Sequence, residues 1–233
     1  MSNTPIQTVL ITGSNRGIGL EYVRQYAQEG WQVIACCRHL AQAEALQSLA
    51  KQYSQIKLFE LDVADFDQID SLANKISSQP LQLVINNAGV YPPSGFKSTD
   101  YEAWMQAFKI NTMSSLKLAE AFVPHMVRAG HAKFVAMTSK MGSIADNTSG
   151  SEYSYRSTKT ALNMVIKSLS HDMERYGVVV AALHPGWVRT DMGGPNGLID
   201  ATTSVSGLRH VISQLDMDQS GKFFAYDGKE IPW

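Results

Sequence analysis

The stretch TVLITGSNRGIGLEYVRQYAQEG, residues 8–30, indicates the fold of this 233-residue chain. It begins with a short apolar run rich in β-branched residues, Thr8 to Ile11, which is typical of a buried strand. The glycine-rich segment TGSNRGIG follows at Thr12 to Gly19, and apolar residues then recur at helical spacing until Gly30. A strand, a glycine-rich turn and a helix in that order predict a dinucleotide-binding unit.

Each glycine of this segment has an expected task. Gly13 would allow the tight turn, Gly17 would let the backbone approach a pyrophosphate, and Gly19 would let helix and strand pack closely. The helix N-terminus would supply free N–H groups to the anion. The alternative is a glycine-rich turn that serves only the topology of the chain. We expect phosphate binding, which makes the neighbouring residues cofactor-binding candidates as well: Ser14, Asn15, Arg16 and Ile18.

Strands and helices alternate along the rest of the chain. Further strands are expected at residues 32–37, 56–60, 81–85, 132–138, 178–183 and 222–225, with helices at 41–53, 66–78, 100–127, from about 155 to 176, and 208–215. The alternation predicts an α/β chain with a single-domain Rossmann fold: a doubly wound, mostly parallel seven-stranded sheet with helices on both faces. Residues 1–233 would form one domain, with a cofactor half at 1–130 and a catalytic and substrate half at 131–233.

Polar residues and glycines follow several of these strands. In a parallel sheet the ligand lies in the crevice at the carboxyl ends of the strands, so these residues should meet at one edge. The candidates there are Gly13, Arg38, Asp62, Val63, Asn86, Asn87, Ala88 and Gly89.

The second strand ends in a basic residue instead of an acidic one. A domain that binds NAD carries an acidic residue there for the ribose hydroxyls, whereas this chain has Arg38 and His39. A guanidinium attracts a 2′-phosphate, and Arg16 adds a second positive charge. We therefore expect NADP(H) as the cofactor; the alternative is that both arginines are solvated surface charges.

Tyr155 and Lys159 are four residues apart, so on a helix their side chains share one face. A neighbouring ammonium group lowers the pKa of a phenol, which would make Tyr155 a general acid for carbonyl reduction. The other interpretation of such a pair is ordinary packing and solvation. Asn111 stands inside an expected helix, where asparagine is unfavourable. It either kinks the helix and binds a water or caps a neighbouring element.

Composition excludes several classes of function. A formal net charge of -1 without a basic stripe argues against nucleic acid as a partner. No apolar run approaches the roughly 20 residues that cross a membrane, and the N-terminus does not resemble a signal peptide, so we expect a cytoplasmic protein. Cys36 and Cys37 should point to opposite faces of a strand as reduced core thiols, with neither a disulfide nor a metal site.

Taken together, TGSNRGIG, NNAG at residues 86–89, Asn111, Ser139, YRSTK at Tyr155 to Lys159, and HPGWVRTDM from His184 resemble the short-chain dehydrogenase/reductases. The glycine spacing and the length are similar to the compact single-domain branch of that family. The segments DNTSGSEYSYRSTKTALN and GKFFAYDGKEIPW resemble the sniffer-like and C-factor-like carbonyl reductases more narrowly.

This resemblance implies roles for individual residues. Tyr155 would protonate the substrate carbonyl, Lys159 would lower the tyrosine pKa and hold the nicotinamide ribose, Ser139 would polarise the carbonyl, and Asn111 would hold a relay water. The nicotinamide end of the cofactor would be seated by Pro185, Gly186, Val188 and Thr190.

The activity implied is NADPH-dependent reduction of aldehydes or ketones. Two alternatives remain, an NADP(H)-binding regulatory protein with vestigial catalysis and a reductase of activated carbon–carbon double bonds. Residues 192–206 would form a small, mobile lid that admits a broad range of small-molecule carbonyl substrates. A homodimer or homotetramer is common in the family, with a monomer as the alternative.

Overall fold

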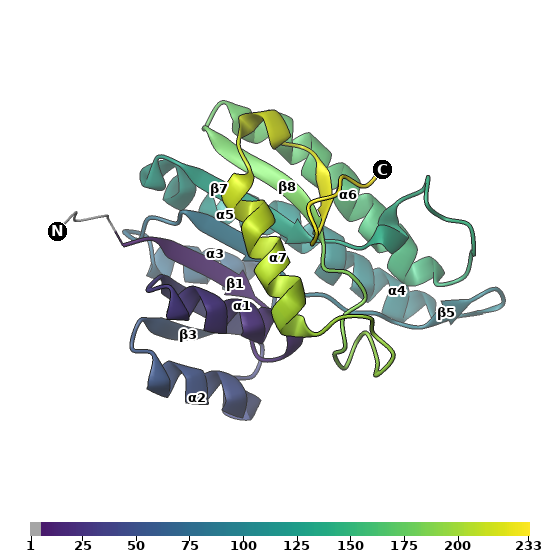
Figure 1. The fold of residues 1–233 in the computed structure, drawn as a ribbon, viewed down its shortest axis with the longest axis horizontal. Helices are drawn as coiled ribbons and strands as arrows, with labels where there is room; N and C mark the ends of the chain where they lie inside the picture. The colour runs from purple at the N-terminus through teal and green to yellow at the C-terminus, as the bar shows by residue number, and fades with distance from the viewer. Residues whose placement is uncertain (1–5) are drawn as a thin grey trace.

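A seven-stranded parallel sheet forms the centre of the protein in the computed structural model, which describes residues 6–233 (Figure 1). The order across the sheet is β3-β2-β1-β4-β7-β8-β9, and every neighbouring pair in it is parallel. The strands are β1 (Thr8–Thr12), β2 (Gln32–Cys37), β3 (Ile56–Glu60), β4 (Leu83–Asn86), β7 (Ala132–Met137), β8 (Val178–His184) and β9 (Phe223–Ala225). This confirms the predicted α/β Rossmann fold and its seven strands.

Helices cover both faces of the sheet. The α-helices are α1 (Gly17–Gln28), α2 (Glu44–Gln52), α3 (Phe66–Lys75), α4 (Tyr101–Phe108), α5 (Ser114–Ala129), α6 (Tyr153–Glu174) and α7 (Ala201–Gln214). Short 3-10 turns lie at Leu40–Gln42, Lys140–Gly142 and Met217–Gln219. Figure 1 shows α1, α2 and α7 in front of the sheet and α3, α5 and α6 behind it.

The strands are apolar on both sides because each face packs against helices. Leu10 of β1 contributes to the core shared with α3, α5 and α6, whereas Val9 and Ile11 contribute to the core shared with α1, α2 and α7. The adjacent thiols divide in the same way, since Cys36 belongs to the first core and Cys37 to the second. Both cysteines are free and buried, as their position in a two-sided strand predicts.

The chain reverses its direction of travel across the sheet next to β1. It moves outward from β1 through β2 to β3, and then returns to the other side of β1 as β4. The connections after β1 and β4 therefore leave the sheet in opposite directions and open a crevice at the carboxyl ends of the strands. Gly13 and Asn87 directly follow these two strands.

Three expected elements differ from the structure. The expected helix at residues 100–127 is divided by a π-helical turn, Lys109–Met113, between α4 and α5. Residues 91–99, for which no strand or helix was predicted, contain a small antiparallel hairpin of β5 (Ser94–Gly95) and β6 (Ser98–Thr99). The last helix was expected at 208–215 but begins at Ala201, so the last six residues of the expected lid, 201–206, are helical.

The early start of α7 has a tertiary cause. The Asp200 carboxylate caps the helix by accepting the Thr203 N–H at 2.8 Å, and Val205 and Leu208 are completely buried. Gly207 has poor helix propensity, but a Cβ there would meet the Tyr226 carbonyl. Packing therefore outweighs the weak helical signal of these small residues.

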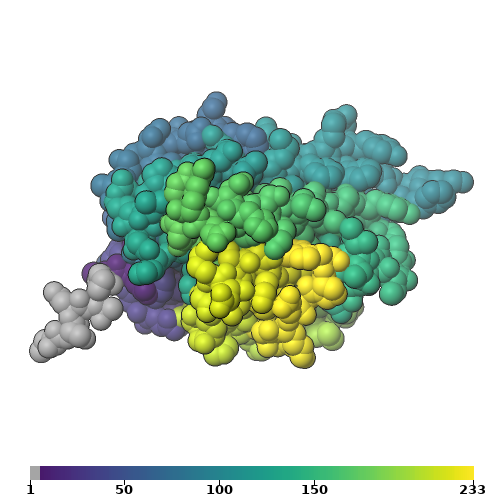
Figure 2. Space-filling model, turned by 90° about the horizontal axis from the view of Figure 1, so that it is seen from above, coloured from purple at the N-terminus to yellow at the C-terminus, as the bar shows by residue number. Residues whose placement is uncertain are grey.

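The C-terminal segment lies on the body of the protein, in yellow beside the green residues of α6 in Figure 2. The Trp233 ring stacks on Phe223 of β9, with ring centroids 5.6 Å apart. The apolar Trp233 side chain therefore packs on the edge strand of the sheet. Among residues 6–233 no helix is both long and apolar enough to cross a bilayer.

Candidate active site

A cavity of about 450 Å³ lies at the crevice beside β1. Its walls come from the glycine-rich loop, the carboxyl ends of β2, β3, β4 and β7, helix α6, and the segment after β8. The residues predicted to bind the cofactor that line it are Gly13, Asn15, Arg16, Gly17, Ile18, Gly19, Arg38, Asp62, Val63, Asn87, Ala88, Gly89, Tyr155, Lys159, Pro185 and Thr190. Tertiary structure thus brings residues from both halves of the chain around one volume.

The glycine-rich loop is packed tightly against the end of β4. Gly13 has a φ of +64°, and a Cβ there would lie 2.9 Å from Ala88 Cα. The Asn87 side-chain amide donates to the carbonyls of Thr12 at 2.9 Å and Gly13 at 3.1 Å. Gly19 has no room for a side chain because a Cβ would meet the Gly13 carbonyl group. Glycine is therefore required at Gly13 and Gly19 for contact between elements.

The N-terminus of α1 opens toward this cavity without a competing acid. Arg16 is its N-cap residue, no side chain caps the helix, and its first turn contains no acidic residue. Free N–H groups at such a terminus bind phosphate well. This arrangement fits a dinucleotide whose pyrophosphate lies at the N-terminus of α1.

The two candidate cations near the 2′-phosphate position differ in their surroundings. The Arg16 guanidinium forms an ion pair with Asp191 at 2.9 Å, between side chains that are 69% and 74% exposed. Arg38 is exposed at the end of β2 and lines the cavity. The ion pair between Arg16 and Asp191 joins the glycine-rich loop to the segment after β8. Because Asp191 partly neutralises Arg16, the Arg38 guanidinium is the less compensated of the two positive charges.

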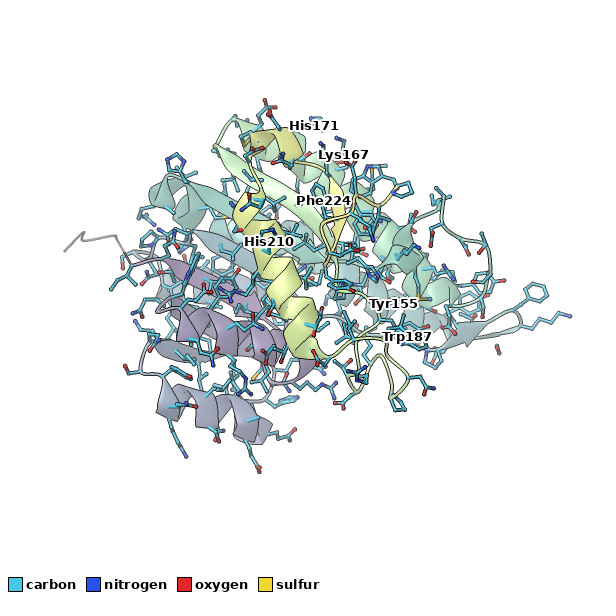
Figure 3. All side chains as sticks on the ribbon, in the orientation of Figure 1. Tyr155, Lys167, His171, Trp187, His210 and Phe224 are labelled. Carbon is cyan, nitrogen blue, oxygen red and sulfur yellow. The ribbon has the colours of Figure 1, made fainter. Side chains whose placement is uncertain are left out.

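Tyr155 and Lys159 lie on the inward face of α6, and their neighbours bury both of them. Tyr155 is 8% exposed and Lys159 is 4% exposed. The Lys159 ammonium nitrogen lies 5.7 Å from the centroid of the Tyr155 ring and donates to the Met137 carbonyl at 2.8 Å. In Figure 3 Tyr155 lies beyond the carboxyl ends of the strands, on the same side of the protein as Trp187.

Burial dominates the ionisation of this pair. Burial raises the pKa of Tyr155 to about 12; hydrogen bonding with Ser139 acts in the opposite direction, and Tyr91 adds to the rise. Burial also lowers the pKa of Lys159 to about 8. Desolvation of the phenolate is the largest influence, so the pKa of Tyr155 lies above its usual value with Lys159 nearby. Tyr155 is therefore a protonated phenol at neutral pH.

Asn111 holds the chain next to Tyr155. Its side-chain oxygen accepts the Val90 N–H at 2.8 Å, while its amide donates to the Val90 carbonyl at 2.9 Å and to Thr158 Oγ1 at 3.0 Å. Asn111 lies in the π-helical turn, which widens the helix where it faces α6. Both sequence interpretations thus contain a part of the answer: the helix is distorted, and the side chain caps a neighbouring segment.

Ser139 follows β7 and lies beside Tyr155. Its side chain accepts the Met141 N–H at 3.1 Å and begins the 3-10 turn that leads away from the strand. The side chains of Asn111, Ser139, Tyr155 and Lys159 therefore gather where β7, α6 and the π-helical turn meet.

Six predicted residues do not line the cavity: Ser14, Asn86, Asn111, Ser139, Gly186 and Val188. Ser14 donates to the Cys36 carbonyl at 2.9 Å and so attaches the glycine-rich loop to β2. Gly186 has a φ of +82° and packs against Tyr226 and Ile199, while Val188 is buried and pairs with Ile199.

Other lining residues were missed by sequence reasoning, among them Cys37, Leu61, Ile110, Met137, Thr138, Arg189, Asp191 and Met192. Cys37, Leu61, Met137 and Thr138 end or directly follow predicted strands, so the rule for carboxyl ends could have found them. Ile110 carries no such signal, because only the packing of the π-helical turn brings it to the cavity.

Comparisons with known proteins agree with this architecture. A family model described as short chain dehydrogenase matches residues 7–198. The C-signal protein of Myxococcus xanthus is 41% identical over 167 residues, which cover 70% of this chain and 99% of that protein.

Solved structures are also similar. The carbonyl reductase Sniffer of D. melanogaster has a TM-score of 0.93 and 35% identity, covering 98% of this chain and 100% of the other. An NADPH-bound carbonyl reductase from chicken fatty liver has a TM-score of 0.92 and 32% identity, covering 99% and 100%. With the glycine-rich loop, the crevice and the buried tyrosine–lysine pair in place, this chain belongs to the short-chain dehydrogenase/reductase family of NAD(P)H-dependent oxidoreductases.

Proposed function

We propose that this protein reduces the carbonyl group of aldehydes or ketones with NADPH, and that Tyr155 is the proton donor. The observation that carries the proposal is the meeting of Asn111, Ser139, Tyr155 and Lys159 at one end of the crevice. Similarity to carbonyl reductases at about one-third identity supports it as well. When bound, the reduced nicotinamide supplies the hydride.

The chain's own residues would handle the proton and the developing charge. The Tyr155 hydroxyl donates its proton to the carbonyl oxygen, and a pKa raised to about 12 keeps that proton available at neutral pH. Ser139 donates a hydrogen bond to the same oxygen and stabilises the charge that develops there. Lys159, charged below pH 8, stabilises the tyrosinate that remains.

Asn111 keeps this arrangement in place. It joins Val90, at the edge of the cavity, to Thr158, one residue before Lys159 on α6. A water held near Asn111 would return a proton to Tyr155 through Lys159, which remains the proposed relay.

The preference for NADPH over NADH rests on Arg38. β2 ends in Cys37 and is followed by a guanidinium where NAD-binding domains have a carboxylate. Arg38 lines the cavity with its charge exposed, and a 2′-phosphate would accept two hydrogen bonds from it.

The test is NADPH consumption with a panel of aldehydes, ketones, quinones and enals, with NADH run in parallel. Wild-type turnover of carbonyls that falls by about 10²–10⁴-fold in Tyr155→Phe supports proton donation by Tyr155. The variant keeps the ring, so its affinity for NADPH should match that of the wild type.

Two other outcomes would replace the proposal. Turnover of enals at the carbon–carbon bond alone would identify a double-bond reductase. Tight NADPH binding without turnover of any compound in the panel would identify a regulatory protein that binds the nucleotide.

A further inference from the structure

Tyr91 packs on the proton donor of the proposed reaction, although no step described above uses it. The ring centroids of Tyr91 and Tyr155 are 4.3 Å apart, with the ring planes inclined by 45°. Val90 lines the cofactor cavity, whereas Tyr91 and Ser139 are outside the set of lining residues. Tyr91 therefore contacts Tyr155 beyond the cofactor cavity, where a substrate has to approach the hydroxyl group.

The segment that carries Tyr91 is anchored at both ends to the elements of the active site. At one end, Asn111 binds both the N–H and the carbonyl of Val90. At the other end, Ser94 accepts the Glu152 N–H at its carbonyl at 2.8 Å and the Ser154 N–H at its hydroxyl at 2.9 Å. Pro92 and Pro93 fill the interval, and their fixed φ angles reduce its freedom. The position of the Tyr91 ring is therefore well determined.

The residues before α6 adopt a costly backbone conformation to make these contacts. Ser151 and Glu152 have φ angles of 56° and 52°, in the left-handed region that residues other than glycine rarely occupy. Such strain persists only where surrounding contacts enforce it, and it is concentrated at functional sites. Here the enforcing contacts are those of Glu152 and Ser154 with Ser94.

The Glu152 carboxylate also affects the ionisation of Tyr91. Burial, the Glu152 charge and a hydrogen bond with its carboxylate raise the pKa of Tyr91 to about 12. Tyr91 is accordingly a protonated phenol, and its ring lies beside Tyr155.

We propose that Tyr91 determines specificity, by providing an aromatic wall beside the Tyr155 hydroxyl that favours aromatic and conjugated carbonyl compounds over aliphatic ones. This inference rests on the proposed carbonyl reductase function. A reacting oxygen must come within about 3 Å of the Tyr155 hydroxyl. An aromatic substituent on that carbonyl then lies close to the Tyr91 ring. Aromatic pairs attract each other when their ring centres are roughly 4.5–7 Å apart.

The experiment compares kcat/KM for 4-nitrobenzaldehyde and hexanal in the wild type, Tyr91→Phe and Tyr91→Ala. Phe96→Ala is the matched control, because Phe96 is an aromatic residue of the same loop that is 79% exposed. Tyr91→Ala should lower the ratio of aromatic to aliphatic kcat/KM about tenfold, which is the upper range for one aromatic pair. Tyr91→Phe and Phe96→Ala should retain the wild-type ratio, and NADPH affinity should be equal in all four proteins.

An unchanged ratio in folded Tyr91→Ala overturns the inference while leaving the reductase function intact. A binding experiment separates the two claims: calorimetry with 4-nitrobenzyl alcohol and hexanol on the protein loaded with NADP⁺. If the wild type turns over neither these aldehydes nor any other carbonyl compound of the panel, the proposed function fails. Selective loss of 4-nitrobenzyl alcohol binding in Tyr91→Ala would still support the aromatic wall, and equal binding in both proteins would refute it.

Discussion

Gly19→Ala tests the contact on which the cofactor cavity depends. A Cβ at Gly19 would lie 2.6 Å from the Asn87 side-chain nitrogen and 2.9 Å from the Gly13 carbonyl carbon, and closer still to the Gly13 carbonyl oxygen. Two of these atoms belong to the backbone, so α1 and the end of β1 have to move apart.

The cost can be worked out from these contacts. Forcing one methyl group into a well-packed site costs about 1–3 kcal/mol. Displacement of Asn87 also weakens its hydrogen bonds to the carbonyls of Thr12 and Gly13, at about 1 kcal/mol in total. The variant should therefore be less stable by about 2–4 kcal/mol, which lowers Tm by about 4–16 °C for a domain of this size.

Thermal unfolding and a fluorescence titration with NADPH measure the two consequences. We expect the lower Tm together with at least tenfold weaker NADPH binding, because the N–H groups of α1 move with the helix. Gly30→Ala is the control: Gly30 has a φ of +82° but no atom near its Cβ position. It should cost about 1 kcal/mol through backbone strain and leave NADPH affinity unchanged. Gly19→Ala with the wild-type Tm and affinity would refute the argument.

Three further predictions concern charge. Arg38→Asp should lower the ratio of kcat/KM with NADPH to kcat/KM with NADH at least tenfold, because Arg16 is already paired with Asp191. Steady-state kinetics with both cofactors measures this ratio, and an unchanged ratio would show that Arg38 has no such role. Burial lowers the pKa of Lys159 to about 8. The value of kcat/KM for reduction should therefore be level below pH 8 and fall about tenfold per pH unit above it. A pH–rate profile that rises above pH 8 would contradict a role for the ammonium group. Burial, and to a smaller extent the Lys140 charge, lowers the pKa of His184 from 6.5 to about 4, while the charges of Asp227 and Asp146 act in the opposite direction. Its contribution to stability is therefore complete above pH 6.5 and is lost as the pH falls to 4, by about 3 kcal/mol at most. Urea unfolding at pH 7 and pH 4.5 should show a smaller loss in His184→Gln than in the wild type, and equal losses would exclude His184 as the cause.

The strand pattern was predictable because the sheet is buried on both faces. A strand such as VVVAAL at residues 178–183 has to be apolar on both sides. Apolar runs of this kind that alternate with helical periods indicate a parallel sheet covered by helices on both faces. Boundaries were less predictable where small or polar residues are involved. The beginning of α7 depends on Asp200 and on buried Val205, whose environment is created by α1 and β8.

The roles of individual site residues divide in the same way. The pair Tyr155 and Lys159 was recognisable because helical geometry alone places positions i and i+4 together. The contribution of Tyr91 was not recognisable, because its contact with Tyr155 depends on hydrogen bonds from Asn111 and Ser94 to distant parts of the chain. The direction of the Tyr155 pKa shift also depends on burial that only the packed protein provides.

The sequence by itself determined the parallel α/β fold, the glycine-rich loop and the alignment of Tyr155 with Lys159. These follow from local rules: the period of apolar residues, the freedom of glycine and the pitch of a helix. Tertiary structure alone decided that Arg16 pairs with Asp191 and that the Tyr91 ring packs at a tilt against Tyr155. It also decided that burial, more than charge, sets the proton affinity of Tyr155. Contacts and desolvation join residues far apart in the chain, and their energies exist only once the chain has packed.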